Sequence, residues 1–71
     1  MNEMDIVMLA RVNTAVAEMY ALNATLEGMK AENAMRESRG EALAYGEQSF
    51  KEIGDAFIAI RITLERLGDL A

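Results

Sequence analysis

Cys and His are absent from this 71-residue chain. The side chains left that could do chemistry include carboxylates, seven cations, two tyrosines and two serines. Without Cys and His there is no thiol nucleophile, no imidazole base and none of the usual zinc or haem ligands. Ser49 has no base within sequence reach, and the Glu52 and Asp55 pair is typical of a solvated helix surface. We therefore expect a protein that is not an enzyme and that uses no metal or cofactor.

Binding of a small anion is the chemistry that remains open. Arg61 interrupts an apolar stretch that runs from Ala56 to Ile62, so it either extends out of an interface or is held for a buried anion or carboxylate. Two tyrosines could stack on a base, although aromatic residues at helical spacing are also typical of a core or an interface. One Arg repeated around an oligomer axis could build an anion site. The candidate ligand-binding residues are Arg11, Tyr20, Tyr45, Lys51 and Arg61.

Two runs of apolar residues, at alternating spacings of four and three, predict the helices that must position these side chains. The first run is Met8, Val12, Ala15, Met19, Leu22, Leu26 and Met29, and the second is Leu43, Gly46, Phe50, Ile53, Phe57, Ile60, Leu64 and Leu67. The chain has no Pro to interrupt either helix. The sequence predicts an all-α fold, an antiparallel two-helix hairpin with helices at about 3–36 and 40–69, in one domain spanning 1–71. One continuous helix that dimerises as a long coiled coil is the alternative.

The helix ends carry their own signals. Asn2 is a candidate N-cap, and the first run stops at Asn33 and Arg36, which indicates a turn near residues 36–41. Two interpretations of the turn stay open. Residues 38–41, Ser-Arg-Gly-Glu, fit a capping box that starts the second helix near Ser38, or Gly40 ends the first helix. We also expect ion pairs of Glu32 with Arg36 and of Glu47 with Lys51.

Apolar residues remain after the two helices have been paired. They are Ile6, Leu9, Val16 and Tyr20 in the first half and Ile58, Ile62 and Leu70 in the second. A chain this short seldom builds a sufficient core alone, so we expect hairpins to assemble into a helical-bundle oligomer, with docking onto a different protein as the alternative. The expected interface residues are Leu9, Val16, Phe50, Phe57, Ile58 and Ile62.

Charge and hydropathy exclude other partners. The net charge of −5 argues against a binder of duplex DNA. No apolar run is longer than that of Ile6 to Ala10, which is far shorter than the roughly 20 residues that span a bilayer. The amino-terminal residues do not resemble a signal peptide. We therefore expect a cytoplasmic protein that has no membrane partner.

Two families resemble parts of the chain. Residues 6–13, Ile-Val-Met-Leu-Ala-Arg-Val-Asn, and the separation of Tyr45 from the apolar residues 57–60 resemble small helical phage proteins that sequester the cyclic nucleotide signals of CBASS immunity. The chain departs from that pattern at Ala10 and Asn13. This resemblance implies an oligomer that buries a nucleotide between protomers, a non-catalytic anti-defence sponge.

In length, hairpin form and the Arg39-Gly40 turn, the chain also resembles the small co-chaperone of type III secretion needle subunits. That resemblance implies the alternative function, a protein-binding hairpin such as a co-chaperone or structural adaptor.

Overall fold

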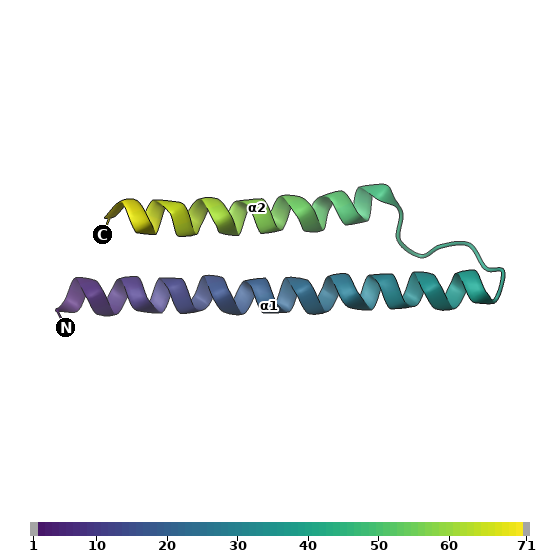
Figure 1. Ribbon diagram of the computed structural model, residues 1–71, viewed down its shortest axis with the longest axis horizontal. Coiled ribbons are helices and arrows are strands. Elements are labelled where there is room, and N and C mark those ends of the chain that lie inside the picture. Colours follow the sequence, from purple (N-terminus) through teal and green to yellow (C-terminus); the bar gives the residue numbers. More distant parts are fainter. Residues whose placement is uncertain (1, 71) are drawn as a thin grey trace.

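The structure, a computed structural model, consists of two antiparallel helices joined by a loop (Figure 1). It describes residues 2–70, except for the side chain of Leu70, so residues 1 and 71 of the expected domain and the side chain of Leu70 lie outside it. Helix α1 spans Glu3–Ser38 and helix α2 spans Glu47–Leu70, with no strand in the described residues. The all-helical class and the hairpin are confirmed, and the alternative of one continuous helix is wrong.

The predicted cap at the start of α1 is confirmed. The Asn2 side chain accepts a hydrogen bond from the Asp5 N–H at 2.9 Å, and the Asp5 carboxylate accepts one from the Asn2 N–H at 3.4 Å. This reciprocal pair satisfies N–H groups that have no partner within the helix. Glu3 and Asp5 also place negative charge at the positive end of the helix dipole.

The end of α1 decides between the two interpretations of the turn. Gly40 has φ +71°, its N–H donates to the Glu37 carbonyl at 3.1 Å, and the Glu41 N–H donates to the Arg36 carbonyl at 2.8 Å. These two bonds form a Schellman motif with Gly40 just beyond the helix. The capping-box interpretation is wrong, because the Ser38 hydroxyl donates back to the Met35 carbonyl at 2.7 Å instead of capping a second helix.

The second helix therefore begins later than expected, at Glu47 instead of residue 40. Leu43 and Gly46, which were assigned to its apolar run, lie in the loop, and Leu43 is exposed. The cause is Asn33 on α1. Its Oδ1 accepts hydrogen bonds from the N–H groups of Ala44 at 3.1 Å and Tyr45 at 3.0 Å, and its Nδ2 donates to the Tyr45 carbonyl at 2.8 Å. Three backbone groups of Ala44 and Tyr45 are thus satisfied by one side chain without forming another helical turn.

The hairpin core is a single thin layer between the helices. Its buried members are Ala15, Met29, Ile60 and Leu67, all of which were predicted for the two apolar runs. Most other members of the runs within the helices are half-buried, but Met19 remains 39% exposed at the edge of the layer. The molecule measures 57 × 18 × 9 Å, with a radius of gyration of 16.9 Å, whereas a compact domain of this length has a radius of about 11 Å.

Candidate functional site

Large apolar side chains are exposed along one side of α1. Tyr20 is 75% exposed, Leu9 49% and Val16 38%. Val16, Met19 and Tyr20 line a shallow hollow together with Phe57 of α2, and Leu9 lies seven residues, or two helical turns, before Val16 on the same side. We call Leu9, Val16, Met19, Tyr20 and Phe57 the apolar face.

The expected interface residues differ in how much of each side chain is exposed to water. Leu9, Val16, Ile58 and Ile62 are exposed, as an interface between copies would require. Phe50 and Phe57 are half-buried, because they also contribute to the layer between the helices. Ile58 and Ile62 are four residues apart and share a side of α2. They do not line the hollow that contains Val16 and Tyr20.

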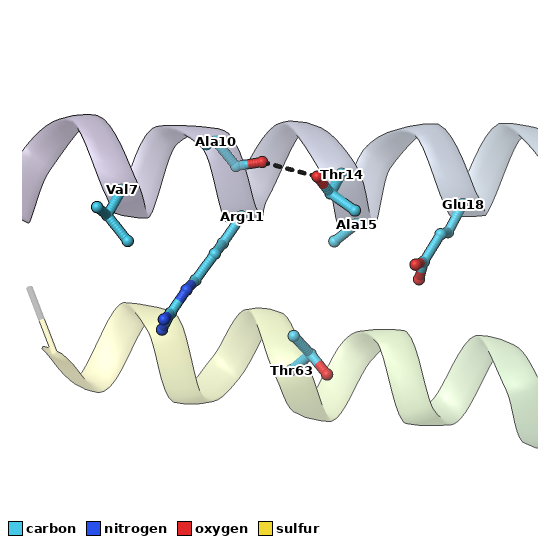
Figure 2. A pocket seen from close by; sticks show the side chains of 7 residues that line it. All are labelled: Val7, Ala10, Arg11, Thr14, Ala15, Glu18 and Thr63. Carbon is cyan, nitrogen blue, oxygen red and sulfur yellow. Dashed lines mark hydrogen bonds between the residues drawn. The ribbon is translucent and has the colours of Figure 1, made fainter.

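A second surface feature is a groove between the helices that contains Arg11. The residues that line it are Val7, Ala10, Arg11, Thr14, Ala15 and Glu18 of α1 and Thr63 of α2, and we call it the Arg11 groove. Figure 2 shows Arg11 and Glu18 projecting from α1 toward α2 on either side of Thr63. The groove is positively charged at one end and negatively charged at the other, and its middle consists of small side chains.

The other two candidate cations already have carboxylate partners. Lys51 Nζ lies 2.9 Å from Asp55 Oδ2, and Arg61 Nε lies 3.7 Å from Glu65 Oε1. The hydrogen bond and the charge of Asp55 raise the pKa of Lys51 above its usual 10.5. The expected pair of Lys51 with Glu47 is thus replaced by the pair with Asp55. Among the described residues no carboxylate lies within 4.0 Å of Arg11.

Arg11 does not share its groove with the other candidate ligand residues. Tyr20 lies nine residues after Arg11, which places it about 180° around α1, and the Arg11 groove includes none of the other four. Tyr45 belongs to the loop, where Asn33 binds its backbone. A ligand site that combined Arg11 with Tyr20 would therefore have to draw them from more than one copy of the chain.

The pair of Arg36 with Glu32 is confirmed, with Nε and Oε1 2.9 Å apart. Arg36 also lies 3.8 Å from Glu41, and Arg39 lies 3.5 Å from the same residue. The two arginines at the turn are thus neutralised by Glu41 and Glu32.

Three residues of functional interest were missed in the sequence. Asn33 lies at the half-buried end of the first apolar run, where a polar side chain is a signal for a specific hydrogen-bond partner. Glu18 carried a signal, because it lies seven residues after Arg11 and therefore on the same face of the helix. Thr63 gave no signal, because its place in the groove depends on how α1 and α2 pair.

No acidic cluster that could hold a metal ion occurs among the described residues. Neither helix, over its described length, has a stretch apolar enough to cross a membrane. No protein-family model, curated protein or solved structure matches the chain. The resemblances to phage sponges and to secretion co-chaperones therefore remain predictions.

Proposed function

We propose that the protein is a non-catalytic binding module that works as an assembly of several hairpins. Copies of the chain associate through the apolar face, which the hairpin alone leaves in contact with water. The observation that carries the proposal is the exposure of this face, with Tyr20 at 75%, Leu9 at 49% and Val16 at 38%. Large apolar side chains grouped on one side of a small protein mark an interaction surface.

The accessible surface supports a second copy as the occupant of this face. The hairpin exposes 5423 Å², whereas a compact protein of 7.8 kDa exposes about 4,400 Å². The excess, roughly 1,000 Å², is similar to the ~800 Å² that each partner buries in a standard interface. Association with another copy would remove this excess and give a bundle of at least four helices, the smallest closed arrangement of two hairpins.

A second candidate function is sequestration of a small anionic ligand, such as a nucleotide immune messenger, within the assembly. The observation that favours it is Arg11, which lies in a groove and has no carboxylate within 4.0 Å among residues 2–70. A free guanidinium binds phosphate through paired hydrogen bonds. An assembly could bring Tyr20 or Arg61 of another copy toward such a ligand. Titration of cyclic dinucleotides and ADP-ribose derivatives by calorimetry tests this candidate, and no heat across the panel contradicts it.

The alternative predicted from the sequence, a hairpin that binds a different protein as a co-chaperone or adaptor, uses the same exposed side chains. It differs in one measurable respect, because the isolated chain would then remain a monomer until its partner is added. The oligomeric state of the pure protein separates the two hypotheses.

Val16→Glu tests the proposal. Val16 is exposed in the hairpin, so the new carboxylate leaves the fold intact but becomes buried and unpaired when two apolar faces meet. We expect unchanged helical circular dichroism and a midpoint concentration of dissociation at least about tenfold higher, measured by light scattering over a wide concentration range.

Ala17→Glu is the matched control. Ala17→Glu adds the same charge at a position that is also exposed on α1, lies about 100° around the helix from Val16 and does not line the hollow of the apolar face. We expect Ala17→Glu to associate like the unchanged protein. Equal weakening by both variants, or by neither, would contradict the assignment of the apolar face as the contact between copies.

A further inference from the structure

The Arg11 groove has a charge pattern that is complementary to itself. Arg11 and Glu18 are seven residues apart on α1, about 10.5 Å along the helix axis, and both project into the groove (Figure 2). Halfway between them lie Thr14 and Ala15. A second α1 helix, laid antiparallel to the first about this midpoint, therefore has its negative charge opposite Arg11 and its positive charge opposite Glu18.

Neither charge is neutralised within the hairpin. Among residues 2–70, no oppositely charged side chain lies within 4.0 Å of Arg11 or of Glu18. Five of the seven cations do have such partners, namely Lys30, Arg36, Arg39, Lys51 and Arg61. The groove thus holds a cation and an anion that are both open to partner charges from outside the hairpin.

The middle of the groove permits the close approach of another helix. Its residues are small, and the Thr14 and Thr63 hydroxyls donate to the carbonyls of Ala10 at 3.0 Å and Ala59 at 3.1 Å within their own helices. The two hydroxyl protons are therefore already used, so they need no partner when the groove is covered. The groove continues along the helices past Ala21 and Thr25 of α1 and Ala56 and Ala59 of α2.

We infer that the Arg11 groove is a second contact between copies, in which two α1 helices lie antiparallel about a twofold axis near Thr14 and Ala15. The twofold axis places each residue of α1 opposite the partner residue whose number brings the sum of the two to 29. Each Arg11 therefore meets the partner's Glu18, and each Glu18 meets the partner's Arg11. The overlapping part of α1 is 3–26, about 36 Å of helix. This inference rests on the proposed self-association and adds its second surface and its register.

The groove contact and the apolar face can be used at the same time. Leu9 precedes Arg11 by two residues and Tyr20 follows Glu18 by two, which places each about 160° around α1 from its charged neighbour. A hairpin with contacts on two sides has two neighbours, and two different twofold contacts close into a tetramer with dihedral symmetry when their axes intersect at right angles.

A small anion is a poorer match to this groove than a second copy. A phosphate bound by Arg11 would lie in the same groove as the Glu18 carboxylate, which repels it. A second copy in the antiparallel register supplies an opposite charge to both residues. The two occupants make different demands on Glu18, because only the second copy requires it.

Charge reversal and its repair test the inference. Arg11→Glu places four carboxylates at the contact, and Glu18→Arg places four guanidinium groups there. Each change acts twice because of the twofold axis, so we expect the midpoint concentration of dissociation to rise at least about 100-fold for either variant at low salt. The double variant Arg11→Glu with Glu18→Arg restores both reciprocal pairs, and we expect its midpoint to return to within about threefold of the unchanged protein.

Lys30→Glu is the control for net charge. It changes the chain from −5 to −7, as Arg11→Glu does, but Lys30 lies outside the groove and pairs with Glu27 at 3.3 Å. We expect Lys30→Glu to leave the midpoint concentration unchanged. Arg11, Glu18 and Lys30 are all exposed, so helical circular dichroism should be the same for every variant.

The outcomes separate the inference from the proposed function. If the unchanged protein stays at 7.8 kDa at the highest concentration, self-association itself is wrong. If it associates but the single reversals leave the midpoint unchanged, or the double variant does not recover, the groove contact is overturned while the apolar-face contact stands. If Arg11→Glu abolishes the binding of cyclic dinucleotides without changing the mass, the groove is a ligand site and the inference is also overturned.

Discussion

Replacing Asn33 with Ala removes the side chain that holds the loop against α1. The change eliminates three hydrogen bonds, at 3.1, 3.0 and 2.8 Å, to the backbone of Ala44 and Tyr45. Each is worth about 0.5–1.5 kcal/mol net, and because these groups are near solvent we take the lower part of the range, a loss of about 2 kcal/mol in all. Ala is the better helix former by about 0.6 kcal/mol, so the free energy of unfolding should fall by about 1.5 kcal/mol.

Thermal unfolding followed by circular dichroism at one fixed protein concentration measures this effect. For a chain of this size the expected loss corresponds to a fall of about 6–12 °C in Tm. Asn13→Ala is the matched control, because Asn13 is exposed on α1 and its replacement carries only the gain in helix propensity. If Asn33→Ala and Asn13→Ala have the same Tm, the loop does not depend on Asn33 and our explanation of the late start of α2 is wrong.

Three further changes test the fold at separate points. Gly40→Ala should lower the free energy of unfolding by about 1–2 kcal/mol in urea titrations, because a residue with a Cβ is strained at φ +71°. The space around the position is open, so backbone strain is the only cost. An unchanged free energy of unfolding would contradict the Schellman end of α1. Ile60→Ala removes a side chain that is 7% exposed and should cost about 2–5 kcal/mol and weaken the assembly, whereas retention of both stability and mass would contradict the proposed core. The bond to Asp55 raises the pKa of Lys51 above 10.5, so its stabilising contribution is present below that pH and is lost as pH rises through the raised pKa. Melting curves from neutral to strongly alkaline pH should show Lys51→Gln lacking this loss, and an identical alkaline loss in the variant would exclude the pair as its cause.

The hairpin could be predicted from the sequence because its cause is local and repeated. Residues such as Ala15 and Met29 in the first run, and Ile60 and Leu67 in the second, recur with the helical period, and all four are buried between the helices. The cap at Asn2 was also predictable, since it depends on residues within one turn of each other.

The start of α2 could not be predicted in the same way. Residues 41–46 contain good helix formers such as Ala42 and Leu43, and the apolar period continues through them. What prevents another turn is a side chain eleven and twelve residues earlier in the sequence, because Asn33 binds the backbone of Ala44 and Tyr45. A tertiary contact of this kind overrides local propensity and has no periodic signal.

The candidate site was predicted in part for a similar reason. The period of α1 indicates that Leu9 and Val16 are left over after the helices pair, and both are exposed. The pairing of Lys51 with Asp55 instead of Glu47 depends on side-chain conformation, because both carboxylates are four residues away. The Arg11 groove depends on Thr63, which reaches α1 only once the two helices have a fixed register.

The mass of the pure protein in dilute solution tests the central claim most directly. Light scattering on the eluting peak, with no partner or ligand added, should give at least twice 7.8 kDa at micromolar concentration, and the mass should fall on dilution as the copies separate. A helical, cooperatively unfolding species that remains at 7.8 kDa at every concentration would show that the hairpin is stable with its apolar face in water, and would contradict the account.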